Sequence, residues 1–540
     1  MADISSPAAV LPQGASLLDK KMKKTPPWIS GAIVLVALVG GLAYIGFHVA
    51  GDLENIRMGS AWPYVLLATA LFIALGFEFV NGFHDTANAV ATVIYTHSLE
   101  PNIAVVWSGL CNLVGVLTSA GAVAFTIITL LPVELILKVS SGAGFAMVFS
   151  LLIAAILWNL GTWWLGLPAS STHTMTGSII GVGVANQLLS NTGGTSGVDW
   201  EQATKVFKVL LISPIVGFGC AALLFLLAKA TIRYPKLYSA PKDNTPPPFP
   251  IRLLLVLTCT GVSFFHGSND GQKGMGLIML ILIGTVPTAY ALNHAVSAHD
   301  IQDFLATSER AASIVDAHVD REAILGPDAR AELTDYLRTK KIQPVTMTAL
   351  RELIRDLAGD VKAFGSYKNV PASQQTNVRN DMYVVSETLR LMAKNHHGNF
   401  TSDEMAALNN YRKHLDQATK FIPSWVKVAV ALALGLGTMV GWKRIVVTVG
   451  EKIGKEHLTY AQGATAELVA MGTIFAADNW GLPVSTTHVL SSGVAGTMAA
   501  NKSGLQLSTI RNIAAAWVFT LPAAALLSGL LFALFRTFAR

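Results

Sequence analysis

Two short stretches, GLPASSTH at 166–173 and GLPVSTTH at 481–488, match at six of eight positions and lie 315 residues apart. A second pair, NGFHDTAN at 81–88 and HGSNDGQK at 266–273, shares its glycine and its aspartate at an offset of 185 residues. The two offsets differ by 130 residues, which is the length of the charged segment 293–422. One duplication, followed by one insertion in the second copy, explains both spacings.

The composition excludes a water-soluble protein. Of the 540 residues, 52% are hydrophobic and 13% are charged, whereas soluble domains carry about 25% charged residues. The net charge of +6 comes from short clusters of Lys and Arg that border apolar runs, which is typical of the inside-facing loops of membrane proteins. We therefore expect the lipid bilayer as a partner and no nucleic acid.

The apolar runs predict an all-α, polytopic membrane protein with ten to twelve membrane segments, including two re-entrant hairpins rich in Ser, Thr and Gly. In the charged segment, apolar residues such as Leu350, Leu353, Ile354 and Leu357 recur at helical spacing, which predicts a soluble helical insertion. The expected parts are an N-terminal tail with an extra transmembrane helix (1–61), a first transmembrane repeat (62–230), a basic Pro-rich linker (231–250), the start of a second repeat (251–292), the insertion (293–422) and the rest of the second repeat (423–540).

Duplicated membrane halves with helices interrupted by Gly and Pro are typical of secondary transporters, which bind their substrate at the interface between the repeats. The chain contains no GxxxxGK[ST] stretch for nucleotide phosphates. We therefore expect a transporter driven by an ion gradient rather than an enzyme.

Asp85 and Asp270 recur at matching places in the two halves, each at the end of an apolar run and in a Gly-flanked, helix-breaking context. A charge at membrane depth costs at least about 2.5–3.5 kcal/mol, so such residues are candidates for a functional site. The alternative is that both aspartates cap helices at a membrane surface.

The two GLPxS stretches predict hairpin helices whose N-termini, with their free N–H groups and hydroxyls, attract an anion. The alternative is that these hydroxyls only cap the hairpins. Because a carboxylate can accept a hydrogen bond from the protonated oxygen of phosphate but repels fully ionised sulfate, phosphate is favoured. The candidate hydroxyl residues are Ser170, Ser171, Thr172, Ser485, Thr486 and Thr487.

Three further residues are candidates for ion coupling. Glu467 lies within an apolar run, and buried carboxylates suit proton coupling. His84 and Asn269 occupy matching positions beside the two aspartates, and imidazole titrates near neutral pH, although a core histidine is an equal alternative. No cluster of ligands with the spacing of a metal site is recognisable, and we expect no resident cofactor.

These elements, in this order, resemble the inorganic phosphate transporter (PiT) family, and specifically its bacterial low-affinity, proton-coupled branch. The resemblance runs from about residue 30 to residue 535 and rests on 81–92, 266–274 and the two GLPxS stretches. It implies two inverted repeats, alternating access, a homodimer and a location in the bacterial inner membrane, with the N-terminus and the insertion cytoplasmic.

The resemblance also implies roles for particular residues. Asp85, Asn88 and Asp270 would lie at the site of the substrate and the coupling ion, with the hairpin hydroxyls around phosphate, and Glu467 matches a glutamate that is important in the family. Members similar to this chain are proton symporters that accept neutral complexes of phosphate with a divalent metal such as magnesium, which would be co-transported.

The chain departs from the common family pattern at two positions. His84 stands where the first signature commonly has Asn, and Asn112 stands where many relatives carry Glu. Both changes favour protons over sodium as the coupling ion. The alternatives are sodium coupling, transport of sulfate or another oxyanion, an intramembrane enzyme for phosphate esters built on His84, Asp85 and Asp270, and a signalling role for the insertion.

Overall fold

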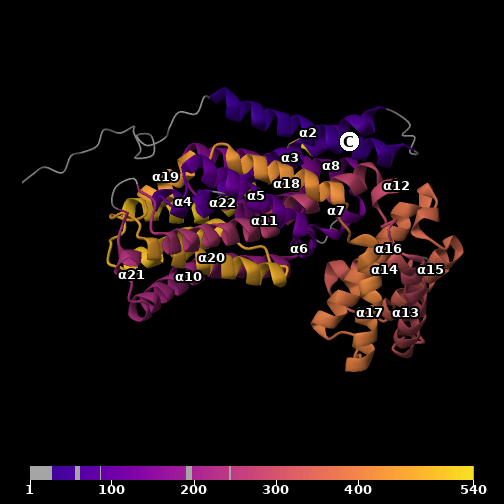
Figure 1. Ribbon diagram of the computed structural model, residues 1–540. Coiled ribbons are helices and arrows are strands. Elements are labelled where there is room, and N and C mark those ends of the chain that lie inside the picture. The colour runs from indigo at the N-terminus through magenta and orange to yellow at the C-terminus, as the bar shows by residue number, and fades with distance from the viewer. Residues whose placement is uncertain are drawn as a thin grey trace, which may run out of the picture.

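The structure is a computed structural model that describes residues 27–54, 61–85, 87–189, 197–241, 245–326 and 328–538. All regular elements in these ranges are helices, and one isolated antiparallel bridge joins Gly454 to Leu505. The all-α prediction is therefore confirmed. A long helical bundle contains both repeats, and the inserted segment forms a separate lobe at one end of it (Figure 1).

The bundle consists of helices from both sides of the insertion. They are α2 (Pro27–Leu53), α3 (Trp62–Asp85), α4 (Ala87–Tyr95), α5 (Pro101–Thr118), α6 (Ala122–Ile128), α7 (Val133–Leu137), α8 (Gly142–Trp164), α9 (Ser171–Leu189), α10 (Trp200–Thr231), α11 (Phe249–Thr285), α12 (Pro287–Tyr290), α18 (Ser424–Met439), α19 (Lys443–Glu451), α20 (Tyr460–Asn479), α21 (Thr486–Ala500) and α22 (Leu507–Phe538), with the short 3-10 helix η1 (Pro235–Tyr238) before α11.

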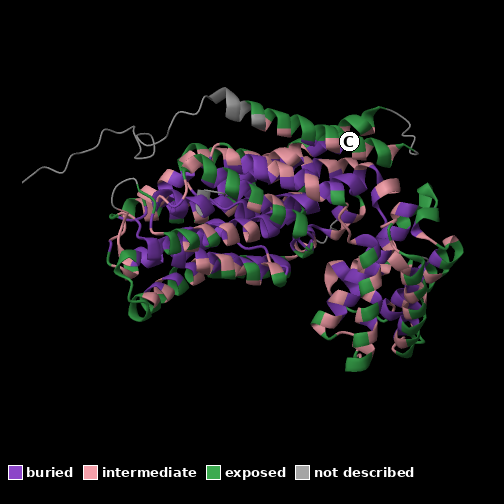
Figure 2. Cartoon of the chain, viewed as in Figure 1, coloured by how far each residue is buried: buried purple, intermediate pink, exposed green. Residues whose placement is uncertain are grey.

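The length and composition of these helices are those of a multi-pass membrane protein. Seven helical segments among the described residues are long and apolar enough to cross a membrane. Large apolar side chains such as Phe72, Ile215 and Val518 are exposed. Figure 2 shows exposed residues along the outer helices of the bundle. In a soluble protein such a surface would aggregate, whereas lipid chains can cover it.

The number of spans is lower than the ten to twelve segments that the apolar runs predict. One reason is α11, because the predicted segments 251–265 and 274–292 form parts of a single helix of 37 residues. A second reason is that neither hairpin helix counts as a span, since α21 has only 15 residues and α9, with 19, is rich in Ser, Thr and Gly.

Asp270 therefore lies in the middle of a continuous helix, and the prediction of a helix break there is wrong. The glycines around it serve close packing instead, since Gly267 faces the backbone of Asn112 in α5, and Gly271 faces Val116. Asp85, in contrast, is the last residue of α3, as predicted.

Each hairpin helix packs against the long helix that follows the other hairpin, α9 against α22 and α21 against α10. Glycines make both contacts close. A Cβ atom added to Gly181 of α9 would lie 1.9 Å from the carbonyl oxygen of Ala525, and one added to Gly217 of α10 would lie 2.3 Å from that of Val489. The two halves thus hold each other's hairpins by direct contact of helix backbones.

The inserted lobe has five helices and a hydrophobic core of its own. They are α13 (Ala298–Ala317), α14 (Ala329–Thr339), α15 (Thr346–Phe364), α16 (Ala372–Asn395) and α17 (Ser402–Thr419), with the 3-10 helix η2 (Tyr367–Asn369) before α16. The four apolar residues of α15 whose spacing predicted a helix are all buried in this core.

The lobe is bound to the first half of the bundle, although it is inserted in the second half. The Lys340 ammonium lies 2.9 Å from a carboxylate oxygen of Asp199, and Lys394 pairs with Glu201, both just after the first hairpin. Asn380 Nδ2 donates to the carbonyl of Leu137 at 3.1 Å. The lobe therefore contacts the segment through which hairpin helix α9 leads into α10.

We expect Gly181→Ala to lower the melting temperature of the purified protein in detergent. The added methyl group would push α22 away from α9, and overpacking of this kind costs about 1–3 kcal/mol. Gly219→Ala on the exposed face of α10, with nothing within 4 Å of the added atom, is the control. Equal melting temperatures of the two variants would contradict the close packing of α9 on α22.

The inserted lobe should lose stability in acid through Glu387 of α16. Burial by itself would raise the pKa of Glu387, but Lys420 at 3.2 Å and Arg390 at 2.6 Å outweigh burial, and the pKa lies below its usual range. Such a carboxylate stabilises the fold above its unfolded pKa of about 4.3, and this contribution is lost as the pH falls through the folded pKa.

Hydrogen exchange in α16 and α17 of the full-length protein, corrected for intrinsic rates, measures this effect. Glu387→Gln should speed exchange at pH 7, corresponding to a loss of about 1–3 kcal/mol, and the difference from wild type should shrink below about pH 4. Glu309→Gln, at an exposed position of α13, is the control. A difference that stays constant with pH would refute the role of the charge.

Candidate functional site

Asp85 and Asp270 come together with the N-termini of the two hairpin helices. Ser171, the first residue of α9, donates to Asp85 Oδ2 at 2.6 Å and lies 3.3 Å from Asp270 Oδ2. Thr487, in the first turn of α21, donates to Asp85 Oδ1 at 2.7 Å. All four side chains are at most 2% exposed, so this conformation closes the site to solvent.

The GLPxS stretches fold into hairpin tips for local reasons. Gly166 and Gly481, at matching positions, adopt φ of +67° and +61°, a left-handed conformation that ends α8 and α20 at little cost for glycine. The hydroxyl oxygen of Ser170 then accepts from the backbone N–H of His173 at 3.3 Å, and that of Ser485 accepts from His488 at 3.2 Å. Both serines therefore cap helices that begin at the site.

The two hairpin tips touch each other. Thr172 donates to the carbonyl oxygen of Val484 at 3.0 Å, and the rings of His173 and His488 lie 4.4 Å apart. The ring of His488 also stacks on Trp517 of α22, at 4.1 Å between centroids. Helices α9 and α21 thus begin side by side, and a helix N-terminus is a favourable place for an anion.

Two side chains that lie at this centre were missed by the sequence reasoning, Lys273 and His266. The Lys273 ammonium is fully buried, 2.8 Å from Asp270 Oδ1 and 2.5 Å from the hydroxyl of Thr172. His266 Nε2 lies 3.6 Å from Asp270 Oδ2, and its Nδ1 contacts the side-chain oxygen of Asn112 at 2.8 Å. Both residues lie within the second copy of the repeat. Lys273 could have been selected from the sequence, because a lysine within an apolar run is unusual.

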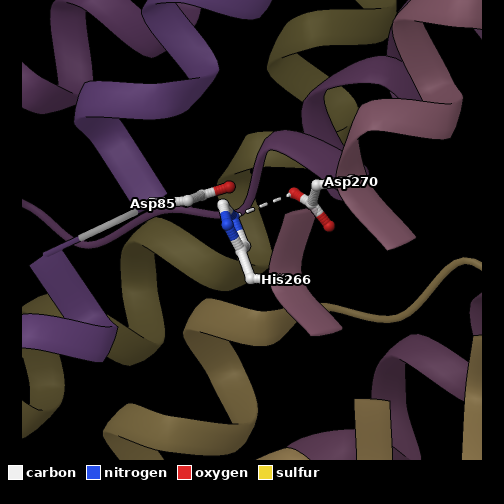
Figure 3. Close-up of side chains that lie close together, drawn as sticks. All are labelled: Asp85, His266 and Asp270. Carbon is white, nitrogen blue, oxygen red and sulfur yellow. Dashed lines mark ion pairs between the residues drawn. The ribbon is translucent and has the colours of Figure 1, made fainter. Parts of the chain in front are cut away.

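Asp85, His266 and Asp270 each offer one ligand atom, and these atoms lie within 4.8 Å of one another. Figure 3 shows the imidazole of His266 between the two carboxylates, with Asp85 at the end of α3 and Asp270 on α11. One imidazole nitrogen and two carboxylate oxygens are a donor set that can hold a proton or a divalent cation.

The other predicted residues lie at varying distances from this centre. His84 contacts Asp85 at 3.2 Å and Thr162 at 3.0 Å, so its ring joins α3 to α8. Asn269 donates to the carbonyl oxygen of Leu482 in the second hairpin at 3.2 Å. Thr486 is buried in the first turn of α21. Asn88 belongs to α4, but its side chain lies outside the described part of the structure.

Glu467 is a separate buried group. Its carboxylate accepts hydrogen bonds from Thr92 of α4 and Thr258 of α11, and the described hydrogen bonds do not connect it to either aspartate. Any part of Glu467 in ion coupling would therefore act through α4 or α11 rather than by direct contact with the two aspartates.

The sequence pattern of the phosphate transporter family matches residues 81–528. The low-affinity inorganic phosphate transporters PitB and PitA of Escherichia coli K12 are each 41% identical to this chain, over 86% of it and 95% of their own length. A probable low-affinity inorganic phosphate transporter of Bacillus subtilis is 27% identical over 86% of this chain and 96% of its own. A solved structure described as "The sodium-dependent phosphate transporter" matches 88% of this chain and 99% of its own, with 19% identity and a TM-score of 0.48.

Proposed function

Because the chain belongs to the phosphate transporter family, we propose that it imports inorganic phosphate by symport with protons, with the substrate held between Asp85, Asp270 and the two hairpin tips. In this closed conformation the hydroxyls of Ser171 and Thr487 donate to Asp85, and in the proposal they turn to donate to the phosphate oxygens when the substrate enters. The carboxylates accept from a protonated phosphate oxygen, which sulfate lacks at neutral pH. The chain is thus a transporter and not an enzyme.

The proposal of symport rests on the charge of the site. Asp85, Asp270 and Glu78 are three buried carboxyl groups near one buried lysine, Lys273, so acidic side chains outnumber lysines in this space. An anion that enters this space meets net repulsion in a medium of low dielectric constant. Phosphate therefore binds well only when protons or a cation enter with it, and His84 and His266, each beside one aspartate, are the nearest titratable rings.

The triad of Asp85, His266 and Asp270 also supports the entry of phosphate as a neutral complex with a divalent metal such as magnesium. In this proposal the metal is part of the transported cargo and not a resident cofactor. Alternating access would open the contact between the hairpin tips first to one side of the membrane and then to the other. The homodimer and the cytoplasmic location of the N-terminus and the lobe stay predictions.

Uptake of labelled phosphate into proteoliposomes tests the proposal. With an imposed pH gradient, without sodium, and with or without magnesium, we expect uptake that follows the proton gradient. Uptake that appears only with sodium would reject proton coupling but keep phosphate. Inhibition by excess sulfate and not by arsenate would reject phosphate as the substrate.

Asp270→Asn should insert and fold but lose most uptake, because it removes an acceptor charge at nearly constant volume, while Lys273 keeps its contact with Thr172. The measurement is the initial rate of uptake in the same proteoliposomes, with the amount of inserted protein determined in parallel. Wild-type uptake by this variant would remove Asp270 from the transport mechanism.

Thr487→Val should weaken phosphate binding by about 1–3 kcal/mol, because it removes a hydroxyl that faces the proposed anion site. The measurement is the affinity of the purified protein for labelled phosphate. Thr497→Val is the matched control, since Thr497 is a buried threonine of the same helix whose hydroxyl contacts only the helix backbone at Val494 in the described hydrogen bonds. An unchanged affinity of Thr487→Val would argue against a contact with phosphate.

A further inference from the structure

Lys273 is a fully buried ammonium group within a helix that crosses the membrane. Charged lysines at this depth are costly and occur where they have a partner or a function. Its partners among the described residues are the Asp270 carboxylate at 2.8 Å and the Thr172 hydroxyl at 2.5 Å. An ammonium group has three N–H donors, so these two contacts leave it the capacity to bind one further acceptor.

The surroundings of Lys273 hold more negative than positive charge. Glu78 of α3 is fully buried, and its carboxylate lies against Gly274, where an added Cβ atom would be 2.3 Å from Glu78 Oε1. Asp85 and Asp270 are the other buried acids nearby. Lys273 therefore supplies the amine that faces a group of three carboxyls, and its removal would take away the lysine that pairs with Asp270.

The internal repeat shows that this cation is present in one half only. The offset of 185 residues that aligns Asp85 with Asp270 also aligns Asn88 with Lys273. The same position after the same aspartate thus carries a neutral amide in the first half and an ammonium group in the second. If both halves carried a neutral residue at this position, each aspartate would need a cation from outside the protein. In this chain Lys273 provides one of these two cations.

We propose that the Lys273 ammonium is the built-in counter-cation of the second half of the substrate site, which pairs with Asp270 and donates its remaining N–H to the bound phosphate. This inference rests on the proposed function. It assigns to Lys273 a direct contact with the substrate, so that Asp85, beside His84, is the aspartate left to an external proton or metal ion. Thr172 supports the contact, because it holds the ammonium at the N-terminus of the hairpin helix α9.

The test is the binding of labelled phosphate to the purified full-length protein in sodium-free buffer, with and without ethylammonium chloride. Lys273→Ala removes the cation and leaves space for a small one. We expect it to bind phosphate roughly tenfold or more weakly than wild type, and to regain several-fold in affinity with ethylammonium. Wild type and Lys427→Ala, which removes a half-buried lysine of α18 that donates to the carbonyl oxygen of Ser119, should not respond to ethylammonium.

Lys273→Gln is the second variant, because it keeps most of the length and loses only the charge. It should bind as weakly as Lys273→Ala but gain nothing from ethylammonium, since its side chain still fills the space. It also keeps the test valid if Lys273→Ala does not fold.

Wild-type affinity in either folded variant would overturn the inference while leaving phosphate transport in place. Weak binding by Lys273→Ala that ethylammonium does not restore would also overturn it, since Lys273 would then only position Asp270 and Thr172. A wild-type protein that binds no phosphate under any condition would overturn the proposed function itself, and the two failures are thus distinguishable.

Discussion

The burial of charge inside a membrane protein is the constraint on which the rest of the structure depends. Asp85 and Asp270 are both removed from water, and an isolated carboxylate in such a place is too costly to remain ionised. Each aspartate is therefore surrounded by polar partners, some from the hairpins and some from its own helix. Ser171 and Thr487 come from the hairpins, His84 from the neighbouring position in α3, and Lys273 from one turn further along α11.

The hairpins can supply these donors only because the backbone elsewhere allows close packing. Contacts between α9 and α22 and between α10 and α21 pass through Gly181 and Gly217, where any larger residue would separate the helices. In this arrangement the tips of the two hairpins are in contact, since Thr172 donates to the carbonyl oxygen of Val484. The glycine contacts that let the helices pack closely therefore also bring the two hairpin N-termini together at the site.

The inserted lobe is joined to the helical bundle by ion pairs. It arises from the second half, but Lys340 and Lys394 pair with Asp199 and Glu201, which follow the first hairpin helix. These pairs are partly exposed, so each is weak alone and sensitive to salt. The lobe connects a segment of each half at the end of the bundle where it lies (Figure 1).

The residues of the candidate site were predictable to the extent that they recur. A repeated aspartate and a repeated GLPxS stretch stand out in an apolar chain, so Asp85, Asp270, Ser171 and Thr487 could be found without a structure. Lys273 and His266 do not recur in the first half, and repetition therefore gave no reason to select them. The helix break predicted at Asp270 failed for a related reason, since glycines that serve contact with α5 look the same in sequence as glycines that end a helix.

By itself, the sequence determined the all-helical membrane fold, the duplication with its inserted lobe and the family to which the chain belongs. The fold and the inserted lobe follow from local composition and spacing, whereas the family was recognised by the resemblance of 81–92, 266–274 and the two GLPxS stretches to its signature elements. Only the tertiary structure decided that α11 is continuous, that Lys273 pairs with Asp270 and that Glu467 lies apart from both aspartates. Lys273 and Asp270 are three residues apart, so their pairing depends on the continuity of α11, whereas the partners of Glu467 come from other helices. Both features depend on how the helices pack, which the order of residues does not state.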